Sequence, residues 1–355
     1  MSKPEPISVL IVAPAEPLVG GQAVQASRLV EKFRDDDEVE VGFLAANPAF
    51  IPPLQKIKYV RTVLTTFRYI LSLLVNIPKY EIIHVFSASF SSFLLAPAPA
   101  ILLGKLFGKK VLLNYRSGFL EKHLTTWPKS TIPLIRKCDV VVTPSRYLVD
   151  VFEKFGIKAR SVHNFVTIDK YKFETRNELR PRFLSNRNFE DLYNVGCTIS
   201  AFARIREEFP EATLTIAGSG PQEQELRRLV GELGSAGIEF VGTVPQKDMP
   251  GLYAKADIYL NSPNIDNMPN SILEAFASGT AVVTTNAGGI PYIVEHERNG
   301  LMVEIGDDKA LAEQAFRLLR DKHLAVELAE GGRSDLEKFK WESVRDDWID
   351  VYRSI

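Results

Sequence analysis

Residues 261–289 read NSPNIDNMPNSILEAFASGTAVVTTNAGG, and this stretch decides the fold of the second half of the chain. Its pattern predicts a strand, a loop, a short helix, a second strand and another loop. Asn270 and Ser271 are favoured at a helix start, and Gly279 is favoured at a helix end. We expect the first amides of this helix, those of Asn270, Ser271 and Ile272, to offer partial positive charge to an anion such as a diphosphate.

Two carboxylates lie close to this helix start. Glu274 falls about one turn inside the helix, about 5 Å along its axis, so its carboxylate can reach a group attached to the bound anion, such as a ribose diol. Asp266 lies in the preceding loop, where it can face the opposite end of the same ligand. The alternative is that both are surface carboxylates that cap a helix, and their spacing alone does not exclude it.

Short apolar runs alternate with amphipathic stretches along the whole chain, beginning with 9–12 and 23–33. The runs contain few polar residues, which is typical of parallel strands buried on both faces. They recur at 39–45, 82–86, 111–114 and 140–143, and again at 183–184, 214–217, 238–241, 258–260 and 281–284. The sequence therefore predicts an α/β protein with two doubly wound, Rossmann-like lobes.

A polar, charged segment at 169–182 separates the two series of strands. We place the connection between the lobes there, because 355 residues are too many for one ordinary core and fit two domains. Ligands of open parallel sheets bind at the carboxyl ends of the strands. The two lobes are therefore expected to face a central cleft that holds the ligand.

Composition excludes several classes of protein. Apolar residues make up 45% and charged residues 25%, as in a folded globular chain. The formal charge of -1 gives no overall field that would attract nucleic acid. Cys138 and Cys197 lack metal-like spacing and are expected to be reduced thiols. The first 14 residues contain no convincing signal-peptide cleavage site, so a cytoplasmic protein is expected.

The stretch at 261–289 resembles the signature of the retaining GT-B glycosyltransferases of family four. In that family two acidic residues separated by seven others come before the glycine that ends a helix and before a later Gly-Gly. Five further stretches are similar to the family in the same order: GGQ at 20–22, TPSRYLVDVF at 143–152, FPEATLTIAGSGP at 209–221, VGTVPQKDMPGLYAKADIYL at 241–260 and GGIPYIVEHERNGLMV at 288–303.

This resemblance implies a GT-B fold with an acceptor-side lobe over 1–168 and a donor-binding lobe over 169–340. It also implies that a last helix within 341–355 crosses back onto the first lobe. The implied activity is transfer of a sugar, with retention, from a nucleoside-diphosphate sugar of the UDP or GDP type. The acceptor would be a glycan, a lipid-linked molecule or another hydroxyl compound, as in polysaccharide biosynthesis.

The resemblance also implies three catalytic residues. Glu274 would hold the ribose hydroxyls, and Asp266 would contact the transferred sugar where the family usually has the longer glutamate. Arg187 stands where the family places a diphosphate-binding arginine, whose fork fits phosphate oxygens. The family's usual lysine is missing from NFEDLYNVG at 188–196. Compensating charge is therefore expected from helix amides, Arg116 or a metal.

Glycine turns supply further expected donor contacts. Gly20 and Gly21 resemble the family's glycine-rich loop after the first strand, where backbone can approach the diphosphate and the acceptor. Gly218, Gly220 and Pro221 resemble a turn that meets the donor, and Val244–Gln246 resemble the loop that meets the nucleobase. All of these segments also fit plain turn chemistry.

Arg116 stands where many relatives carry a histidine that contacts the donor sugar. It is expected either to bind a phosphate or an acidic acceptor, or to be an ordinary exposed or ion-paired arginine. The histidines at 84, 123 and 163 are isolated, so structural roles are expected for them. We find no metal-binding motif near the expected donor site, and we therefore expect no cofactor and no metal requirement.

Residues 56–77 combine basic and apolar residues in one amphipathic stretch. Arg61 and Arg68 interrupt its apolar run, so it does not predict a bilayer-spanning segment. A basic amphipathic helix can lie on an anionic membrane, where a lipid-linked acceptor would be found. The alternative is a helix packed against the sheet of its own lobe.

Two other functions fit a two-lobed sugar-nucleotide protein. One is a noncatalytic subunit that binds the sugar nucleotide, which the departures at Asp266, at Arg116 and at the missing lysine support. The other is a nucleotide-sugar epimerase, although its usual acid and base residues are not recognisable here.

Overall fold

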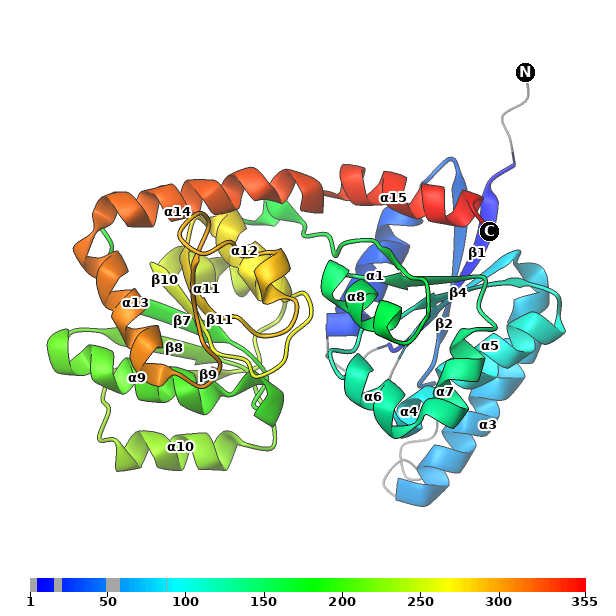
Figure 1. Cartoon of the computed structure of the whole chain (residues 1–355), viewed down its shortest axis with the longest axis horizontal. Coiled ribbons are helices and arrows are strands. Elements are labelled where there is room, and N and C mark those ends of the chain that lie inside the picture. Colours follow the sequence, from blue (N-terminus) through cyan, green and yellow to red (C-terminus); the bar gives the residue numbers. More distant parts are fainter. Residues whose placement is uncertain (1–4, 16–20, 49–57, 88) are drawn as a thin grey trace. The chain divides into compact units, whose positions relative to one another are not determined.

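The computed structural model describes residues 5–15, 21–48, 58–87 and 89–355 (Figure 1). The chain divides into two compact units, one made of Met1–Phe165 with Trp341–Ile355 and the other of Val166–Lys340. The boundary after Phe165 lies three residues before the one expected from the sequence.

The first unit contains a six-stranded sheet in which every pair of neighbours is parallel, in the order β2-β1-β3-β4-β5-β6. Its strands are β1 (Ile7–Ala13), β2 (Val39–Ala45), β3 (Ile82–Phe86), β4 (Lys110–Asn114), β5 (Val140–Thr143) and β6 (Arg160–Ser161). The central strands are buried on both faces, whereas β2 lies at an edge and is partly exposed. This difference follows from position, because an edge strand has a neighbour on one side only.

Helices cover both faces of this sheet (Figure 1). Val9 and Ile11 of β1 pack with α1 and α15 on one face, while Leu10 and Val12 pack with α3, α5 and α8 on the other. The helices are α1 (Gly21–Phe33), α3 (Lys58–Asn76), α4 (Ser91–Leu95), α5 (Pro97–Leu106), α6 (Leu120–Thr126), α7 (Pro128–Ile135), α8 (Arg146–Lys154) and α15 (Trp341–Arg353), with a 3₁₀ turn at η1 (Ile77–Lys79).

The last helix, α15, packs on the first unit through the apolar stripe that the sequence shows. Val344, Trp348 and Tyr352 are buried against the sheet. The Tyr352 hydroxyl lies 2.8 Å from Nδ1 of His84, and the Arg345 guanidinium pairs with Asp36 at 2.6 Å. Both polar contacts join the last segment of the chain to the first segment of this unit.

The second unit contains another six-stranded parallel sheet, in the order β12-β11-β10-β7-β8-β9. Its strands are β7 (Arg182–Asn186), β8 (Thr213–Ala217), β9 (Ile238–Gly242), β10 (Ile258–Asn261), β11 (Ala281–Thr285) and β12 (Leu301–Val303). The order reverses between β7 and β10, which is the arrangement of a Rossmann sheet.

Side chains of successive residues in these strands enter two different cores. Phe183 and Val283 pack with α9 and α13 on one face, whereas Leu184 and Val282 pack with α11 and α12 on the other. The helices are α9 (Val195–Glu208), α10 (Glu223–Glu232), α11 (Met249–Lys255), α12 (Asn270–Ser278), α13 (Asp308–Arg320) and α14 (Lys322–Asp335), with 3₁₀ turns at η2 (Ile168–Lys170), η3 (Asp191–Tyr193), η4 (Ile290–Tyr292) and η5 (Leu336–Phe339).

The predicted fold class is confirmed in both units. All ten strands expected from apolar runs are present, and the sequence missed only the short edge strands β6 and β12 among those that the structure describes. β6 consists of the polar residues Arg160–Ser161, so no apolar run marks it, and the three residues Leu301–Val303 of β12 were not assigned to a strand.

Segment 169–182 is packed on the second unit, although its polar composition suggested a connection between lobes. Three of its arginines surround the buried carboxylate of Asp257: Arg176 at 3.1 Å, Arg180 at 3.6 Å and Arg182 at 2.8 Å. The charges that made this stretch resemble a linker therefore neutralise a carboxylate inside the unit.

Candidate active site

Two loops meet where the strand order of the second unit reverses. Arg187 follows β7 directly, and Asp266 lies in the loop between β10 and α12. Because β7 and β10 are neighbouring parallel strands, their carboxyl ends open on the same edge of the sheet. Ligands of doubly wound sheets bind at this edge, at the point of reversal. The topology therefore brings together residues 79 positions apart in the sequence.

Helix α12 begins at this edge and is almost wholly buried. Ile272 is fully buried, Ser271 is 6% exposed and Glu274 is 4% exposed. The helix ends at Gly279, whose φ of 68° lies in the left-handed region that glycine adopts without strain. A β-carbon there would also meet the carbonyl oxygen of Glu174 at 2.5 Å. The predicted start and stop of this helix are therefore observed.

The guanidinium of Arg187 lies at the amino end of α12. Its Nη1 donates a hydrogen bond to Oγ of Ser271 at 3.1 Å, and its Nη2 donates to Oδ2 of Asp266. Its Cζ lies 4.0 Å from the centre of the Tyr193 ring. The buried Nε has no acceptor among the described residues. Arg187 is thus fixed by three neighbours, and two of its five N–H donors are used in these hydrogen bonds.

Asp266 provides the negative charge beside this arginine. Its Oδ1 accepts a hydrogen bond from the backbone amide of Asn267 at 2.7 Å. The side chains of Arg187 and Asp266 are only 10% and 12% exposed. Burial lowers the pKa of Arg187, but the Asp266 carboxylate outweighs this effect and holds the pKa above its ordinary value. Arg187 therefore remains a full positive charge at the helix start.

Glu274 presents its carboxylate to polar side chains from another helix and loop. Its Oε1 accepts a hydrogen bond from Nε2 of Gln246 at 3.0 Å, and its Oε2 lies 3.3 Å from the Tyr253 hydroxyl. That hydroxyl also lies 2.9 Å from the carbonyl oxygen of Ser271. The interpretation of Glu274 and Asp266 as surface carboxylates is wrong, since both side chains are largely buried.

Gly218 and Gly220 shape the loop that carries Arg187. A β-carbon on Gly218 would lie 2.1 Å from the carbonyl oxygen of Arg187, and one on Gly220 would lie 2.5 Å from that of Phe189. The Phe189 amide donates to the Ser219 carbonyl at 3.0 Å. These glycines therefore let two backbone segments touch, which fixes the position of the arginine.

The structure adds Tyr253 and Tyr193, which the sequence did not indicate. Tyr253 on α11 contacts Glu274, and the Arg187 guanidinium lies over the Tyr193 ring. Gln246, in the loop expected to meet the nucleobase, also donates to Glu274. Asn186 at the end of β7 donates to the Tyr253 hydroxyl at 2.9 Å. The family-like segment at 241–260 contains two of these side chains, but no spacing rule links them to Glu274. Val244, the residue expected in that segment, is half-buried, as is Asn270 at the start of α12.

The predicted residues of the first unit are placed as follows. Gly21 begins α1, and Gly20 lies outside the described residues. Arg116 follows β4 and is half-buried, with hydrogen bonds to the side-chain oxygens of Asn114, at 3.4 Å, and Asn164. Its guanidinium also lies 5.4 Å from the Phe86 ring centre. Burial lowers the pKa of Arg116.

The two buried histidines have structural partners. Burial, with a smaller effect of nearby Arg116, lowers the pKa of His84 to about 3, and Nδ2 of Asn114 lies 3.0 Å from its Nε2. Burial lowers the pKa of His123 to about 4, and its ring nitrogens lie 2.9 Å from the Tyr115 hydroxyl and 3.1 Å from that of Thr131. Both histidines are therefore neutral parts of the core.

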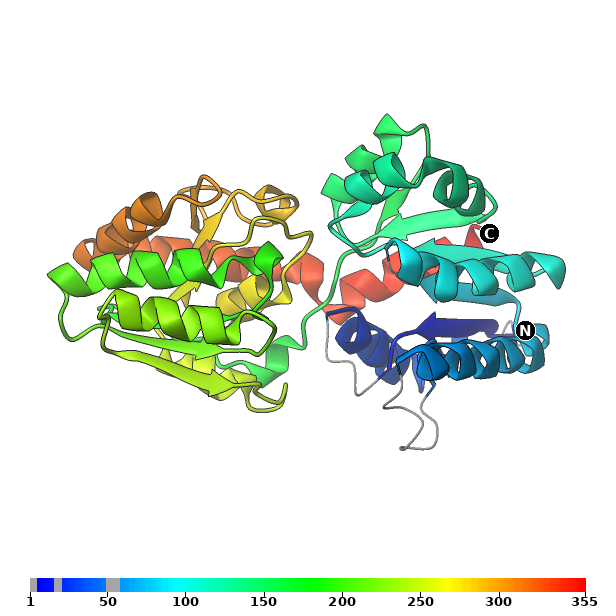
Figure 2. The same ribbon diagram turned by 90° about the horizontal axis from the view of Figure 1, so that it is seen from below.

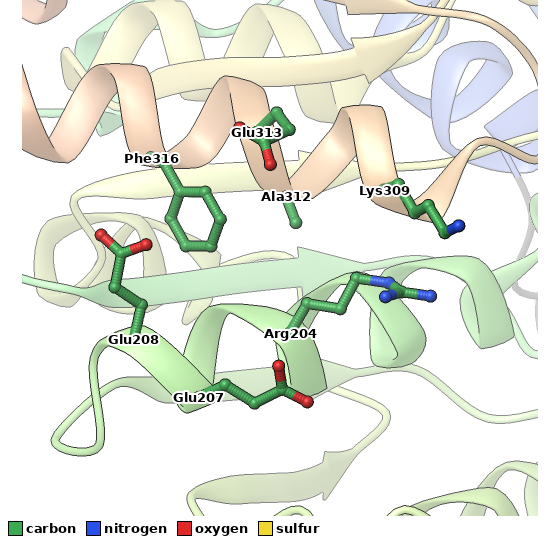
Figure 3. Close-up of a pocket in the computed structure, with 7 residues that line it drawn as sticks. All are labelled: Arg204, Glu207, Glu208, Lys309, Ala312, Glu313 and Phe316. Carbon is green, nitrogen blue, oxygen red and sulfur yellow. The ribbon is translucent and has the colours of Figure 1, made fainter.

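A pocket opens between α9 and α13 (Figure 3). These helices cover the face of the sheet opposite to α12. Charged side chains dominate the lining, which consists of Arg204, Glu207, Glu208, Lys309, Ala312, Glu313 and Phe316. None of the residues predicted to bind a ligand lines it.

Among the described residues, no three His, Cys, Asp or Glu side chains are grouped to hold a metal ion. Cys138 and Cys197 are free thiols.

Comparison with known sequences connects the second unit to a family. Residues 181–321 match the model of "Glycosyl transferases group 1". The chain is 28% identical to the lipopolysaccharide core biosynthesis glycosyltransferase LpsE of Rhizobium meliloti, over 69% of this chain and 73% of LpsE. It is 26% identical to the N-acetyl-alpha-D-glucosaminyl L-malate synthase of Bacillus anthracis, over 62% of this chain and 61% of that enzyme.

Solved structures match nearly the whole chain. The crystal structure of Anabaena HepE in complex with UDP-glucose has a TM-score of 0.78 and 16% identity, covering 98% of this chain and 100% of HepE. Sucrose-phosphate synthase from Thermosynechococcus elongatus has a TM-score of 0.76 and 20% identity, covering 98% of each chain. The chain is therefore similar to the group 1 glycosyltransferases over 181–321 and has the GT-B fold of two Rossmann-like lobes.

Proposed function

We propose that this chain is a retaining glycosyltransferase of family four, which transfers a sugar from a nucleoside-diphosphate sugar to a hydroxyl acceptor. The observation that carries the proposal is the cluster at the start of α12, where Arg187 contacts both Ser271 and Asp266. Glu274 lies one turn further along the same helix. A cation, a helix amino end and a carboxylate at this spacing suit a diphosphate joined to a ribose.

The roles of the residues follow from their chemistry. The guanidinium of Arg187 and the first amides of α12 bind the diphosphate oxygens and stabilise the charge that grows on them as the sugar leaves. Glu274 accepts hydrogen bonds from the ribose hydroxyls, and Gln246 and Tyr253 hold its carboxylate in place. Asp266 contacts the transferred sugar and pairs with the guanidinium of Arg187.

In the transfer step, the bond between the anomeric carbon and the diphosphate oxygen breaks. A new bond forms between this carbon and the acceptor oxygen on the same face of the sugar. The acceptor's proton passes to the departing phosphate oxygen, so the step needs no strong base from the protein. It does need stabilisation of the leaving negative charge, which is the capacity that Arg187 and the helix start provide.

The relatives suggest which donors to try first. HepE was crystallised with UDP and with UDP-glucose, and a relative from Mycobacterium tuberculosis is a GDP-mannose-dependent mannosyltransferase with 29% identity over 44% of this chain and 43% of that enzyme. A thermal-shift panel of UDP-, GDP-, ADP- and TDP-sugars, with and without a divalent cation, would identify the donor, because a ligand that binds the native state raises the melting temperature. We expect a UDP- or GDP-sugar to give the largest shift and the cation to be unnecessary.

The site assignment is tested with matched variants. Glu274→Gln should lower the donor-induced shift, whereas Glu313→Gln should not, since Glu313 is an exposed glutamate on the other face of the sheet. With the donor known, NMR of the first-formed product reports the anomeric configuration, and inversion would contradict a retaining mechanism. A chain that binds the donor but neither transfers nor hydrolyses it would be a noncatalytic subunit. Conversion of the donor without an acceptor into another sugar nucleotide would indicate an epimerase.

A further inference from the structure

Exposed apolar side chains gather in one part of the first unit. Among the described residues, twelve of the sixteen large hydrophobic side chains that are exposed lie between residues 41 and 120. They are Phe43, Val63, Leu64, Phe67, Leu71, Leu74, Val75, Leu94, Leu95, Leu102, Leu106 and Phe107. Scattered exposed hydrophobic residues need no explanation, but a concentration of this kind indicates an interaction surface.

Six of these residues form one stripe along α3. At 3.6 residues per turn they fall within an arc of about 120°, and Val63, Phe67 and Val75 are each more than 60% exposed. A second stripe of the same helix, with Tyr69 and Leu73, is buried in the core of the unit. One face of α3 is therefore packed in the core of its own unit, as one interpretation of the sequence expected. The opposite face is apolar and exposed to solvent.

The surface continues from α3 onto α4 and α5. The Tyr69 hydroxyl donates to the carbonyl oxygen of Ala96, between α4 and α5, at 2.8 Å. Figures 1 and 2 both show α3 running beside α5 along the same side of the sheet. Leu95 on α4 and Leu102 and Leu106 on α5 are 44%, 47% and 77% exposed. We call the exposed apolar residues of α3, α4 and α5 the apolar surface.

The stretch of sequence that carries this surface is rich in lysine and arginine. Residues 41–120 contain nine lysines and arginines but only one acidic residue, Glu81, although the whole chain has a formal charge of -1. Arg68 is exposed and borders the stripe of α3, and Lys79 and Lys110 are exposed at the ends of neighbouring elements. Lys105 on α5 is paired with Asp139 at 2.8 Å. The exposed cations described beside the apolar side chains are therefore Arg68, Lys79 and Lys110.

We infer that the apolar surface docks on an anionic lipid bilayer. Apolar side chains on one face of a helix enter the boundary between head groups and acyl chains, while lysines and arginines beside them meet the lipid phosphates. An anionic membrane accounts both for the exposed apolar side chains and for the exposed cations Arg68, Lys79 and Lys110 beside them. No helix in the described ranges combines the length and hydropathy needed to cross a bilayer.

Vesicle cosedimentation of the full chain tests this inference. Phosphatidylcholine vesicles with and without phosphatidylglycerol are compared at low and high salt, with no sugar nucleotide present, so the result does not depend on the donor site. We expect clear binding to the anionic vesicles that falls with added salt. The triple substitution Val63→Gln, Phe67→Gln, Val75→Gln should reduce binding at least tenfold. Each substitution removes the favourable free energy of moving a large apolar side chain from water into the membrane.

Controls separate membrane docking from unfolding or self-association. Leu233→Gln with Ile305→Gln removes exposed hydrophobic residues of the second unit and should leave vesicle binding unchanged. Arg68→Glu should weaken binding to anionic vesicles by about fivefold or more. All variants should keep the wild-type melting temperature.

Three results would overturn the inference. Equal binding to neutral and anionic vesicles would remove the role of charge, and unchanged binding of the triple variant would remove the apolar surface. A wild type that ignores vesicles but forms a dimer, which the triple variant loses, would assign the surface to a second copy of the chain.

Discussion

The substitution Glu274→Gln should separate donor binding from folding. The Glu274 side chain is 4% exposed, and its two oxygens lie 3.0 Å from Nε2 of Gln246 and 3.3 Å from the Tyr253 hydroxyl. Glutamine has nearly the same shape and keeps one acceptor oxygen. The change therefore removes a buried negative charge while it disturbs the packing of α12 very little.

The expected effects on binding and stability have different signs. A hydrogen bond to a charged group contributes about 1.5–3 kcal/mol, so losing the charged contact to the ribose should weaken donor binding by about 10- to 150-fold. The free energy of unfolding should stay the same or rise, because folding no longer buries a charge. In contrast, Glu274→Ala takes the acceptor from Gln246 and Tyr253 and leaves a cavity, which should cost about 2–4 kcal/mol of stability.

Isothermal titration calorimetry with the donor found in the thermal-shift panel measures the dissociation constant, and urea unfolding measures stability. Glu313→Gln provides the control for a lost glutamate charge at an exposed position. The reasoning would be refuted by a Glu274→Gln variant that binds the donor as tightly as the wild type. It would also fail if this variant lost as much stability as Glu274→Ala, since Glu274 would then act mainly in the core.

Two other predictions concern the second unit, and a third concerns the core of the first unit. Asp266→Asn should tighten the binding of a bare nucleoside diphosphate severalfold in calorimetry, since a carboxylate no longer competes for Arg187. The same variant should transfer sugar more slowly. Weaker binding of the diphosphate would contradict this reasoning. Gly218→Ala should lower both the melting temperature and the donor affinity, because its β-carbon would lie 2.1 Å from the Arg187 carbonyl oxygen. Gly231→Ala is the control and should lower neither, because a β-carbon there has no neighbour within 4 Å. The low pKa of His84, about 3, means that below pH 6.5 the unfolded chain binds a proton that the folded chain excludes. Stability should therefore fall by about 1.4 kcal/mol per pH unit toward pH 3 from this group alone, and a His84→Asn variant with the same slope would exclude His84 as the cause.

The sequence predicted those features of the fold that depend on local patterns. Apolar runs identified ten strands, and Gly279 identified the end of α12, because burial on both faces and a left-handed backbone restrict residue type wherever they occur. Segment 169–182 was misplaced for the same reason. Its charges are visible locally, but their common partner, Asp257, lies 75 residues or more along the chain.

The candidate site was only partly predictable. Topology rules place Arg187 and Asp266 at one edge of a sheet, but they do not show that the two side chains pair. The pairing depends on side-chain direction in two loops, and so do the contacts of Tyr253 and Gln246 with Glu274. Such contacts follow from packing, for which one sequence provides no local signal.

The pairing of Arg187 with Asp266 also connects two departures from the family pattern. A site that lacks the second cation at 188–196 has less positive charge to share among anions. An acidic side chain beside its one arginine would then oppose a diphosphate more strongly than in a site with two cations. The amides at the start of α12 do not titrate. Under the proposed function, diphosphate binding would therefore depend mainly on these amides and on the capacity of Arg187 to exchange the carboxylate for phosphate oxygens.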